Sequence, residues 1–278
     1  MTIVDPHVHV WTHDPAYPWA PETSQPPPGE AAPEALIAEM AANGVDRTVL
    51  VQVIYYRWDN RYTAHVRETY PDQFMAVCRV NPEDPAAPDH LSYWIEKRGF
   101  HGVRLSPAAD ASGDWFTGPL MDPLFRRAAD LGVPMLILTR PPRLPDLAAL
   151  LERHPDLDVV VDHMADVTLE DTQGIRALLD LARYPHVHVK ISHTWSISRQ
   201  EYPWRDAQEL VERVHQAFGA RRLMWGTDWP MCLQHTSYGR TLSVVRDEMS
   251  FFTDEEREWV LGKTALKLWP SHLHEGDR

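Results

Sequence analysis

Eight short apolar runs, rich in β-branched residues, recur along the chain and constrain its fold more than any other feature. Stretches with helical periodicity separate them, which is the pattern of repeated βα units and a parallel sheet. The runs span residues 3–8, 48–54, 74–80, 102–105, 135–139, 159–162, 187–191 and 223–227. A doubly wound open sheet usually stops at five or six strands, so eight predict a closed (β/α)8 barrel.

Amphipathic segments predict the helices between these strands, and Gly44, Gly132 and Gly219 follow three of them where a left-handed C-cap residue is favoured. The segments span residues 33–42, 91–97, 123–131, 144–153, 175–182 and 207–218. The length of 278 residues suits one barrel, which typically needs about 250. No Gly/Ser linker or low-complexity stretch divides the chain, so we expect one domain over 1–278.

Two segments lie outside the βα repeat. The proline-rich stretch 13–32 follows the first strand, so in a barrel it lies on the catalytic face, as a pocket wall or lid or as a stiff surface loop. From Asp254 onward, the pattern predicts an extra helix pair packed on the outside of the barrel.

The composition excludes several classes of partner. A formal net charge of −13 opposes binding to nucleic acid or to anionic membranes, because both carry phosphate. No apolar run approaches the ~20 residues that span a bilayer, and no targeting segment precedes the first strand. With two cysteines, the sequence predicts a cytoplasmic protein with free thiols, and it leaves open whether the protein is a homo-oligomer.

His7 and His9 stand one residue apart at the end of the first predicted strand. Alternate residues of a strand share a face, so both imidazoles can reach one ion or one carbonyl oxygen. In a chain with 15 histidines such a pair arises easily by chance, and its partners therefore decide its meaning.

Three other predicted strands end in residues of matching chemistry. The sixth run leads into His163, which the period of two places on the same face as Val159 and Val161. The seventh leads into His193 and the eighth into Asp228. The carboxyl ends of barrel strands form the catalytic face, so these groups should converge there with the histidine pair.

Neutral imidazoles and a carboxylate suit a divalent metal, with Zn²⁺ the best match and His7, His9, His163 and Asp228 as ligands. No lysine ends the fourth or fifth run, so a carbamylated lysine bridging two ions is not expected, and the site should hold one metal or none. Asp228 is the predicted general base for water. In a metal-free site, the three histidines would donate hydrogen bonds to the developing oxyanion.

Other residues near the predicted catalytic face suggest how a substrate is bound. Arg104 and Arg140 follow the fourth and fifth strands and could pair with a carboxylate or sulfonate. Tyr56 and Trp229 fall in or beside catalytic-face loops and suggest a ring-shaped ligand, with His193 as a further contact. These residues predict a small substrate that is anionic or polyhydroxylated.

The motifs together resemble the amidohydrolase superfamily, and in particular its lactone hydrolases that act on pyrone-dicarboxylate, sulfomuconolactone and sugar lactones. The resemblance rests on His-x-His, Asp-His-Met, Gly-Thr-Asp-Trp-Pro and the segments 56–62, 79–82 and 99–105. It implies a (β/α)8 barrel with His7, His9 and His163 around a substrate carbonyl or a metal, and Asp228 activating water. Members of the family include zinc-binding and metal-free enzymes.

Two departures from that pattern leave alternatives open. Met231 stands where pyrone-dicarboxylate lactonases have a histidine, which makes that substrate a poorer match. His193 stands where these lactonases usually have a small residue, whereas related decarboxylases can have a histidine there. The leading hypothesis is therefore lactone hydrolysis. The alternatives are metal-dependent, non-oxidative decarboxylation of an unsaturated or aromatic acid, and a non-catalytic small-molecule-binding barrel.

Overall fold

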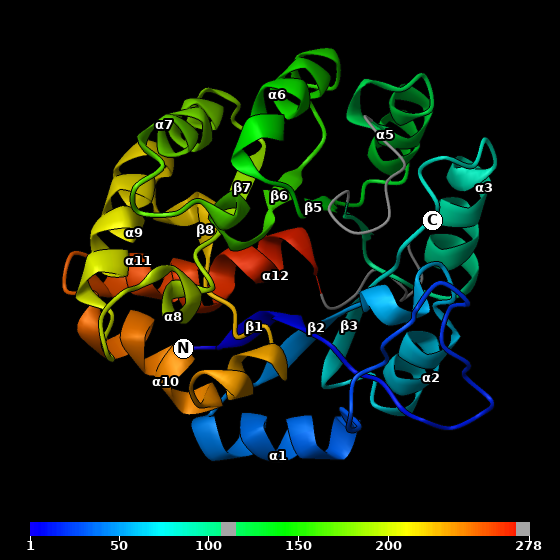
Figure 1. Ribbon diagram of the computed structural model, residues 1–278, viewed down its shortest axis with the longest axis horizontal. Helices are drawn as coiled ribbons and strands as arrows, with labels where there is room; N and C mark the ends of the chain where they lie inside the picture. The colour runs from blue at the N-terminus through cyan, green and yellow to red at the C-terminus, as the bar shows by residue number, and fades with distance from the viewer. Residues whose placement is uncertain (107–114, 271–278) are drawn as a thin grey trace.

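The computed structural model describes residues 1–106 and 115–270, and its eight strands run parallel around a barrel (Figure 1). They form two ladders, of three and five strands. Single parallel bridges close the two seams, Cys78 to Val103 between the ladders and Val8 to Trp229 between the first and last strands. The strands are β1 (Val4–Val8), β2 (Arg47–Val51), β3 (Phe74–Val77), β4 (Val103–Leu105), β5 (Met135–Ile137), β6 (Val159–Val161), β7 (Val187–Lys190) and β8 (Leu223–Met224). All eight predicted strands and the barrel are confirmed.

The main helices surround the strands, as Figure 1 shows. They are α1 (Pro33–Asn43), α2 (Arg61–Thr69), α3 (Ala87–Ser92), α5 (Met121–Asp130), α6 (Leu144–Arg153), α7 (Thr172–Asp180), α8 (Thr194–Ile197), α9 (Arg205–Phe218) and α10 (Tyr238–Ser243). Helices α2, α8 and α10 lie outside the predicted segments, and in α2 a mostly polar sequence hides the buried stripe of Tyr62 and Val66. Gly44 ends α1 in the left-handed conformation, with its amide bonded to the Met40 carbonyl.

The end of the chain differs from the predicted helix pair. Residues 254–268 are helical without interruption, through α11 (Asp254–Glu258), a π-helical turn (Trp259–Lys263) and α12 (Thr264–Leu268). Trp269 and Leu268 pack with the inward-facing Val4, Val160 and other valines of the strands, not on the outside. The segment therefore closes the end of the barrel at which the strands begin (Figure 1).

The stretch 13–32 packs against the 3-10 helix that follows β2. Trp19 stacks on Tyr56 with ring centroids 4.6 Å apart and an interplanar angle of 11°. The Ala20 amide and the Thr23 hydroxyl both donate to the carbonyl of Tyr55, at 3.0 and 2.8 Å. These contacts fix the 3-10 helix Ile54–Tyr56, which follows β2.

Cys78 and Cys232 are buried, free thiols, as the sequence predicts. Within the two described ranges, we find no helix with the length and apolarity needed to cross a membrane.

Candidate active site

Asp228 lies at the centre of a group of histidines at the carboxyl ends of the strands. Its Oδ1 atom is 3.1 Å from His9 Nε2 and 3.7 Å from His7 Nε2. Its Oδ2 atom accepts a hydrogen bond from His193 Nε2 at 2.8 Å. His163 completes the group, with its ring 4.5 Å from His7 and stacked on His193 at 3.6 Å. The predicted convergence of four histidines and one aspartate is thus present.

Three of these side chains reach the site through backbone turns, not through strand alternation. His163, His193 and Asp228 have φ values of 52°, 65° and 55°, a region that non-glycine residues rarely adopt. Such conformations cost about 1–3 kcal/mol each and concentrate at functional sites. These left-handed conformations thus lower the stability of the fold, and they direct the three side chains into one pocket.

The expected geometry of His163 was wrong, although the residue is in the site. Val160 belongs to the inner cluster of the barrel, whereas Val159 and Val161 pack outside it. Asp162 therefore continues the inward face, and His163 would point outward if the strand went on. The left-handed turn at His163 reverses its direction and carries the imidazole into the pocket.

The junction of β1 and β8 sets the position of the histidine pair. Asp5 accepts hydrogen bonds from the amides of His7 and Thr227 and from the Thr227 hydroxyl, which bonds at 2.6 Å. A Cβ at Gly226 would lie 3.4 Å from the His7 Cβ, an ordinary van der Waals contact, so the two strands pack closely at this point. Burial raises the pKa of Asp5 to about 6.

A buried ion cluster under the pocket was missed in the sequence. Asp162 Oδ1 lies 3.0 Å from Lys190 Nζ, and its Oδ2 accepts from Arg104 Nε at 2.9 Å. Burial alone would raise the pKa of Asp162, but Lys190, His7 and Arg104 outweigh burial and hold this pKa well below its ordinary value. Lys190 occupies an inward position of β7, and that alternation was the signal available in the sequence.

His193 bridges two carboxylates. Its Nδ1 atom is 3.5 Å from Asp166, on the side opposite its bond to Asp228. Burial would lower the pKa of His193, but the bonds to Asp166 and Asp228 outweigh it and raise this pKa to about 9. His163 behaves in the opposite way, because burial and then His193 lower its pKa well below the usual value. The surroundings therefore favour the charged form of one ring, His193, and the neutral form of the other, His163.

A cavity of about 180 Å³ opens above this group. Two of the predicted substrate contacts, Arg104 and His193, lie in its wall, and Met231 occupies one side. The wall consists of His9, Val53, Ile54, Tyr55, Arg104, Ser106, Leu138, His163, Asp166, His193, Asp228 and Met231. It combines an apolar side with a polar floor, which suits a small ring that carries polar groups.

Three other predicted substrate contacts do not lie in the described wall. Arg140 is exposed. Tyr56 is buried and donates a hydrogen bond from its hydroxyl to the Thr12 carbonyl. Its neighbour Tyr55 lines the cavity instead. Trp229 is 3% exposed and packs in the core. Sequence position places a residue near a face, but it does not give the direction of the side chain.

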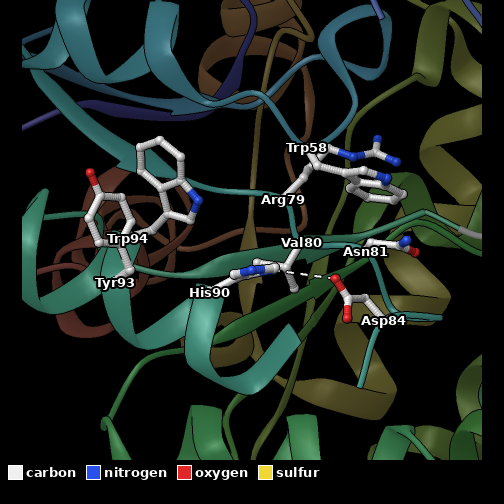
Figure 2. Close-up of a pocket in the computed structure, with 8 residues that line it drawn as sticks. All are labelled: Trp58, Arg79, Val80, Asn81, Asp84, His90, Tyr93 and Trp94. Carbon is white, nitrogen blue, oxygen red and sulfur yellow. Dashed lines mark ion pairs between the residues drawn. The ribbon is translucent and has the colours of Figure 1, made fainter. Parts of the chain in front are cut away.

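A second cavity, of about 370 Å³, lies between the segment that follows β3 and the helical residues of α3 and the turn after it, and it is drawn in Figure 2. Trp58, Arg79, Asn81 and Trp94 are among its wall residues, and the Arg79 guanidinium lies over the Trp58 ring. Among the described residues, it shares no wall residue with the first cavity and contains no cluster of metal-ligating side chains. The candidate catalytic and metal-ligating side chains therefore lie at the first cavity, around Asp228.

The donor set around Asp228 fits one divalent metal ion. His7, His9 and Asp228 offer ligand atoms within 4.8 Å of one another, as do His163, His193 and Asp228. His7 Nε2 and Asp228 Oδ1 are buried without a hydrogen-bond partner in the part of the chain that the structure describes. Imidazole nitrogens with a carboxylate oxygen are the ligands of catalytic zinc sites.

Residues 4–271 match the model of a protein family described as amidohydrolase. The chain belongs to this family. It is 30% identical over 236 residues to an L-fucono-1,5-lactonase from Burkholderia ambifaria, with 82% of this chain and 80% of that protein covered. The predicted superfamily is thus confirmed.

Solved structures of family members have the same architecture. One from Pseudomonas putida, described as a 2-pyrone-4,6-dicarboxylic acid hydrolase, has a TM-score of 0.83 and 25% identity, covering 98% of this chain and 99% of the other. An amidohydrolase from Burkholderia multivorans with bound zinc has a TM-score of 0.79 and 25% identity, covering 96% and 99%.

Proposed function

We propose that this amidohydrolase opens the ring of a small lactone with a water molecule that Asp228 activates. The observation that carries the proposal is the arrangement of that carboxylate. His193 holds Oδ2, whereas Oδ1 is directed at the Nε2 atoms of His7 and His9, beside the cavity. One oxygen is therefore fixed, and the other has no hydrogen-bond partner among the described residues and can accept a proton. The 30% identical lactonase supports this reaction class.

The reaction needs one proton to move twice. Oδ1 of Asp228 takes a proton from a water molecule. At the same time the water oxygen bonds to the lactone carbonyl carbon, which gives a tetrahedral intermediate. The carbon-to-ring-oxygen bond then breaks, and Asp228 returns the proton to the departing ring oxygen. Burial would raise the pKa of Asp228, but the hydrogen bond from His193 and the positive charge of that imidazole outweigh burial and hold it well below its usual value. Asp228 is therefore ionised at the start and releases the proton readily at the end.

The carbonyl oxygen becomes negative in the intermediate, and the histidines lie where it can be stabilised. His163 is held at Nδ1 by the Ser192 hydroxyl at 2.7 Å, and it lines the cavity. His7 contributes its Nε2 atom from the other side of Asp228. Donors fixed before the reaction stabilise an oxyanion without the cost of reorganisation.

Zn²⁺ is the ion that we propose for the site, held by His7, His9, His163 and Asp228. Its support is the donor set and the zinc-containing structure from B. multivorans. When bound, such an ion polarises the carbonyl and lowers the pKa of water. The roles of Asp228 and His193 in holding and moving the proton are the same with or without it.

The substrate that we propose is a lactone with hydroxyl groups or one carboxylate. The Ser106 hydroxyl lines the cavity and has no hydrogen-bond partner within residues 1–106 and 115–270, so a substrate hydroxyl could bond to it. Arg104 lines the same wall with its Nε engaged by Asp162, and its positive charge favours an anionic group in the cavity. Met231 provides an apolar side, a poor match for a dicarboxylate. The net charge of −13 further supports a small molecule over a nucleic acid.

Proton release against a panel of sugar, carboxylated and sulfonated lactones tests the proposal, with metal-free and zinc-loaded enzyme in parallel. Hydrolysis by the wild type and by Asp84→Asn, but not by Asp228→Asn, is the expected result. Asp84 is a matched control because it also faces a histidine, His90 at 3.7 Å, but in the second cavity (Figure 2). Release of carbon dioxide from an unsaturated or aromatic acid, with no lactone hydrolysed, would refute the proposal and show that the enzyme is a decarboxylase. Binding without any turnover would support a non-catalytic barrel.

A further inference from the structure

The two histidines of the His-x-His pair have opposite hydrogen-bond partners at Nδ1. In His9 this atom lies 2.7 Å from the carbonyl oxygen of Val51. A carbonyl can only accept, so His9 Nδ1 carries a proton. In His7 the corresponding atom lies 2.9 Å from Lys190 Nζ.

Lys190 is fully buried and directs its amino group at His7 from β7. A lysine ammonium has three donors and no acceptor, so the His7 atom facing it must present a lone pair. The carboxylate of Asp162 is farther away, with Oδ1 3.4 Å from His7 Nδ1, and it forms an ion pair with Lys190 at 3.0 Å. The shortest contact of His7 Nδ1 is therefore with a donor.

We propose that Lys190 is a positioning residue that keeps the proton of His7 on Nε2. An imidazole whose Nδ1 accepts a hydrogen bond has its proton on the other nitrogen. His7 then presents an N–H beside Asp228 Oδ1, 3.7 Å away, and acts as a hydrogen-bond donor. In the lactone reaction proposed above, the target of this N–H is the carbonyl oxygen; only that target rests on the proposed function.

His9 is complementary to His7. With its proton on Nδ1, a neutral His9 directs the lone pair of Nε2 at Asp228 Oδ1, 3.1 Å away. Two acceptors at this distance repel one another unless a cation or a water proton lies between them. His9 and Asp228 are thus ready to bind a cation, whereas His7 must first move its proton to Nδ1. In the metal-free site, the pair that looks symmetric in the sequence consists of one hydrogen-bond donor and one acceptor.

Long-range ¹H–¹⁵N spectra of histidine-labelled, metal-free wild-type protein test this directly, with the His7 signals assigned by their loss in His7→Gln. We expect the Nε2 of His7 and the Nδ1 of His9 to be the protonated nitrogens. A proton on Nδ1 of His7 would overturn the proposal, and this outcome depends on neither activity nor the folding of a Lys190 variant.

Lys190→Met provides the second measurement, with Lys267→Met, an exposed lysine, as its control. Without the donor, the His7 proton should move to Nδ1, facing Asp162, and Nε2 should become a ligand. Zn²⁺ binding by calorimetry should then tighten in Lys190→Met, because His7 Nε2 no longer has to lose a proton before it binds the ion, and it should not change in Lys267→Met. We expect a change of about tenfold, since residues behind a metal ligand typically alter its affinity by at least this factor. Unchanged zinc affinity in a folded Lys190→Met protein would contradict the proposal. Silence of the wild type on every lactone, with the expected tautomers in its spectrum, would refute only the proposed function.

Discussion

The hydrogen bond from His193 Nε2 to Asp228 Oδ2, 2.8 Å long, gives the two oxygens of this carboxylate different tasks. Oδ2 is held in place, and Oδ1 is left beside the cavity. Because β7 leads into His193 and β8 into Asp228, neighbouring strands of the barrel set the direction of the general base.

Replacing Asp228 by asparagine should lower kcat/KM about 10³-fold, the usual size of a general-base effect. The amide keeps the shape of the side chain but cannot accept a proton from water. Initial rates of proton release on the best lactone measure the effect. A loss below tenfold would show that another group is the base.

Replacing His193 by glutamine should flatten the dependence of stability on alkaline pH. The pKa of His193 is about 9 in the folded protein, above the ordinary value of 6.5, so its protonated form is favoured by folding. This stabilisation is full below pH 6.5 and is lost as the pH rises through 9. Urea midpoints of wild type and His193→Gln between pH 6 and 10 should therefore converge at the alkaline end. Parallel curves would argue against an imidazolium at this position.

Protonation of His7 should contribute to the loss of folding stability at acid pH. Burial, followed by repulsion from Lys190, lowers the pKa of His7 to about 3, so the folded state favours the neutral ring. The resulting stability is present above pH 6.5 and is lost as the pH falls from there towards 3. His7→Gln should remove part of the acid-side slope in urea midpoints measured between pH 7 and 4. An unchanged slope would assign the acid sensitivity to other groups.

Replacing Asp162 by asparagine should destabilise the fold by about 3–5 kcal/mol, because it leaves the buried cations Lys190 and Arg104 without their carboxylate. Glu255→Gln is the control, since this residue pairs with Arg221 at 3.4 Å on the surface, where the side chains are 70% and 71% exposed. That change should cost less than about 1 kcal/mol. Equal losses in guanidinium unfolding would show that burial of the cluster has little energetic weight.

Replacing Met231 by histidine should shift specificity towards carboxylated lactones. The side chain lines the cavity, so an imidazole there would add a donor to an otherwise apolar side. We expect the ratio of kcat/KM for a carboxylated over an uncharged lactone to rise about tenfold, the value of one charge-assisted hydrogen bond of about 1.5 kcal/mol. A constant ratio would place the substrate anion elsewhere.

The sequence predicts those parts of the molecule that depend on local pattern. Runs of β-branched residues gave all eight strands, and strand ends gave the histidines and Asp228. Helix α2 was not predicted, because its many polar residues obscure the apolar periodicity of a narrow buried stripe. Side-chain direction was the weaker part, since His163 depends on a left-handed turn that alternation cannot anticipate.

Long-range pairing explains the other omissions. Lys190 ends β7 and Asp162 directly follows the neighbouring β6, and both appear in the sequence as isolated charges in apolar runs. Their importance comes from His7, which is 183 residues from Lys190 in the chain. Arg140 and Trp229 show the converse, since proximity to a strand end did not bring their side chains to the cavity wall.

The packing of Trp269 against the inner valines also has a consequence for synthesis. The floor of the barrel is contributed by nearly the last residues that the structure describes. While these residues are still inside the ribosomal exit tunnel, the strands already outside lack the side chains that seal them from water. The nascent chain can therefore form its ladders early, but it can complete its core only after Trp269 has left the tunnel.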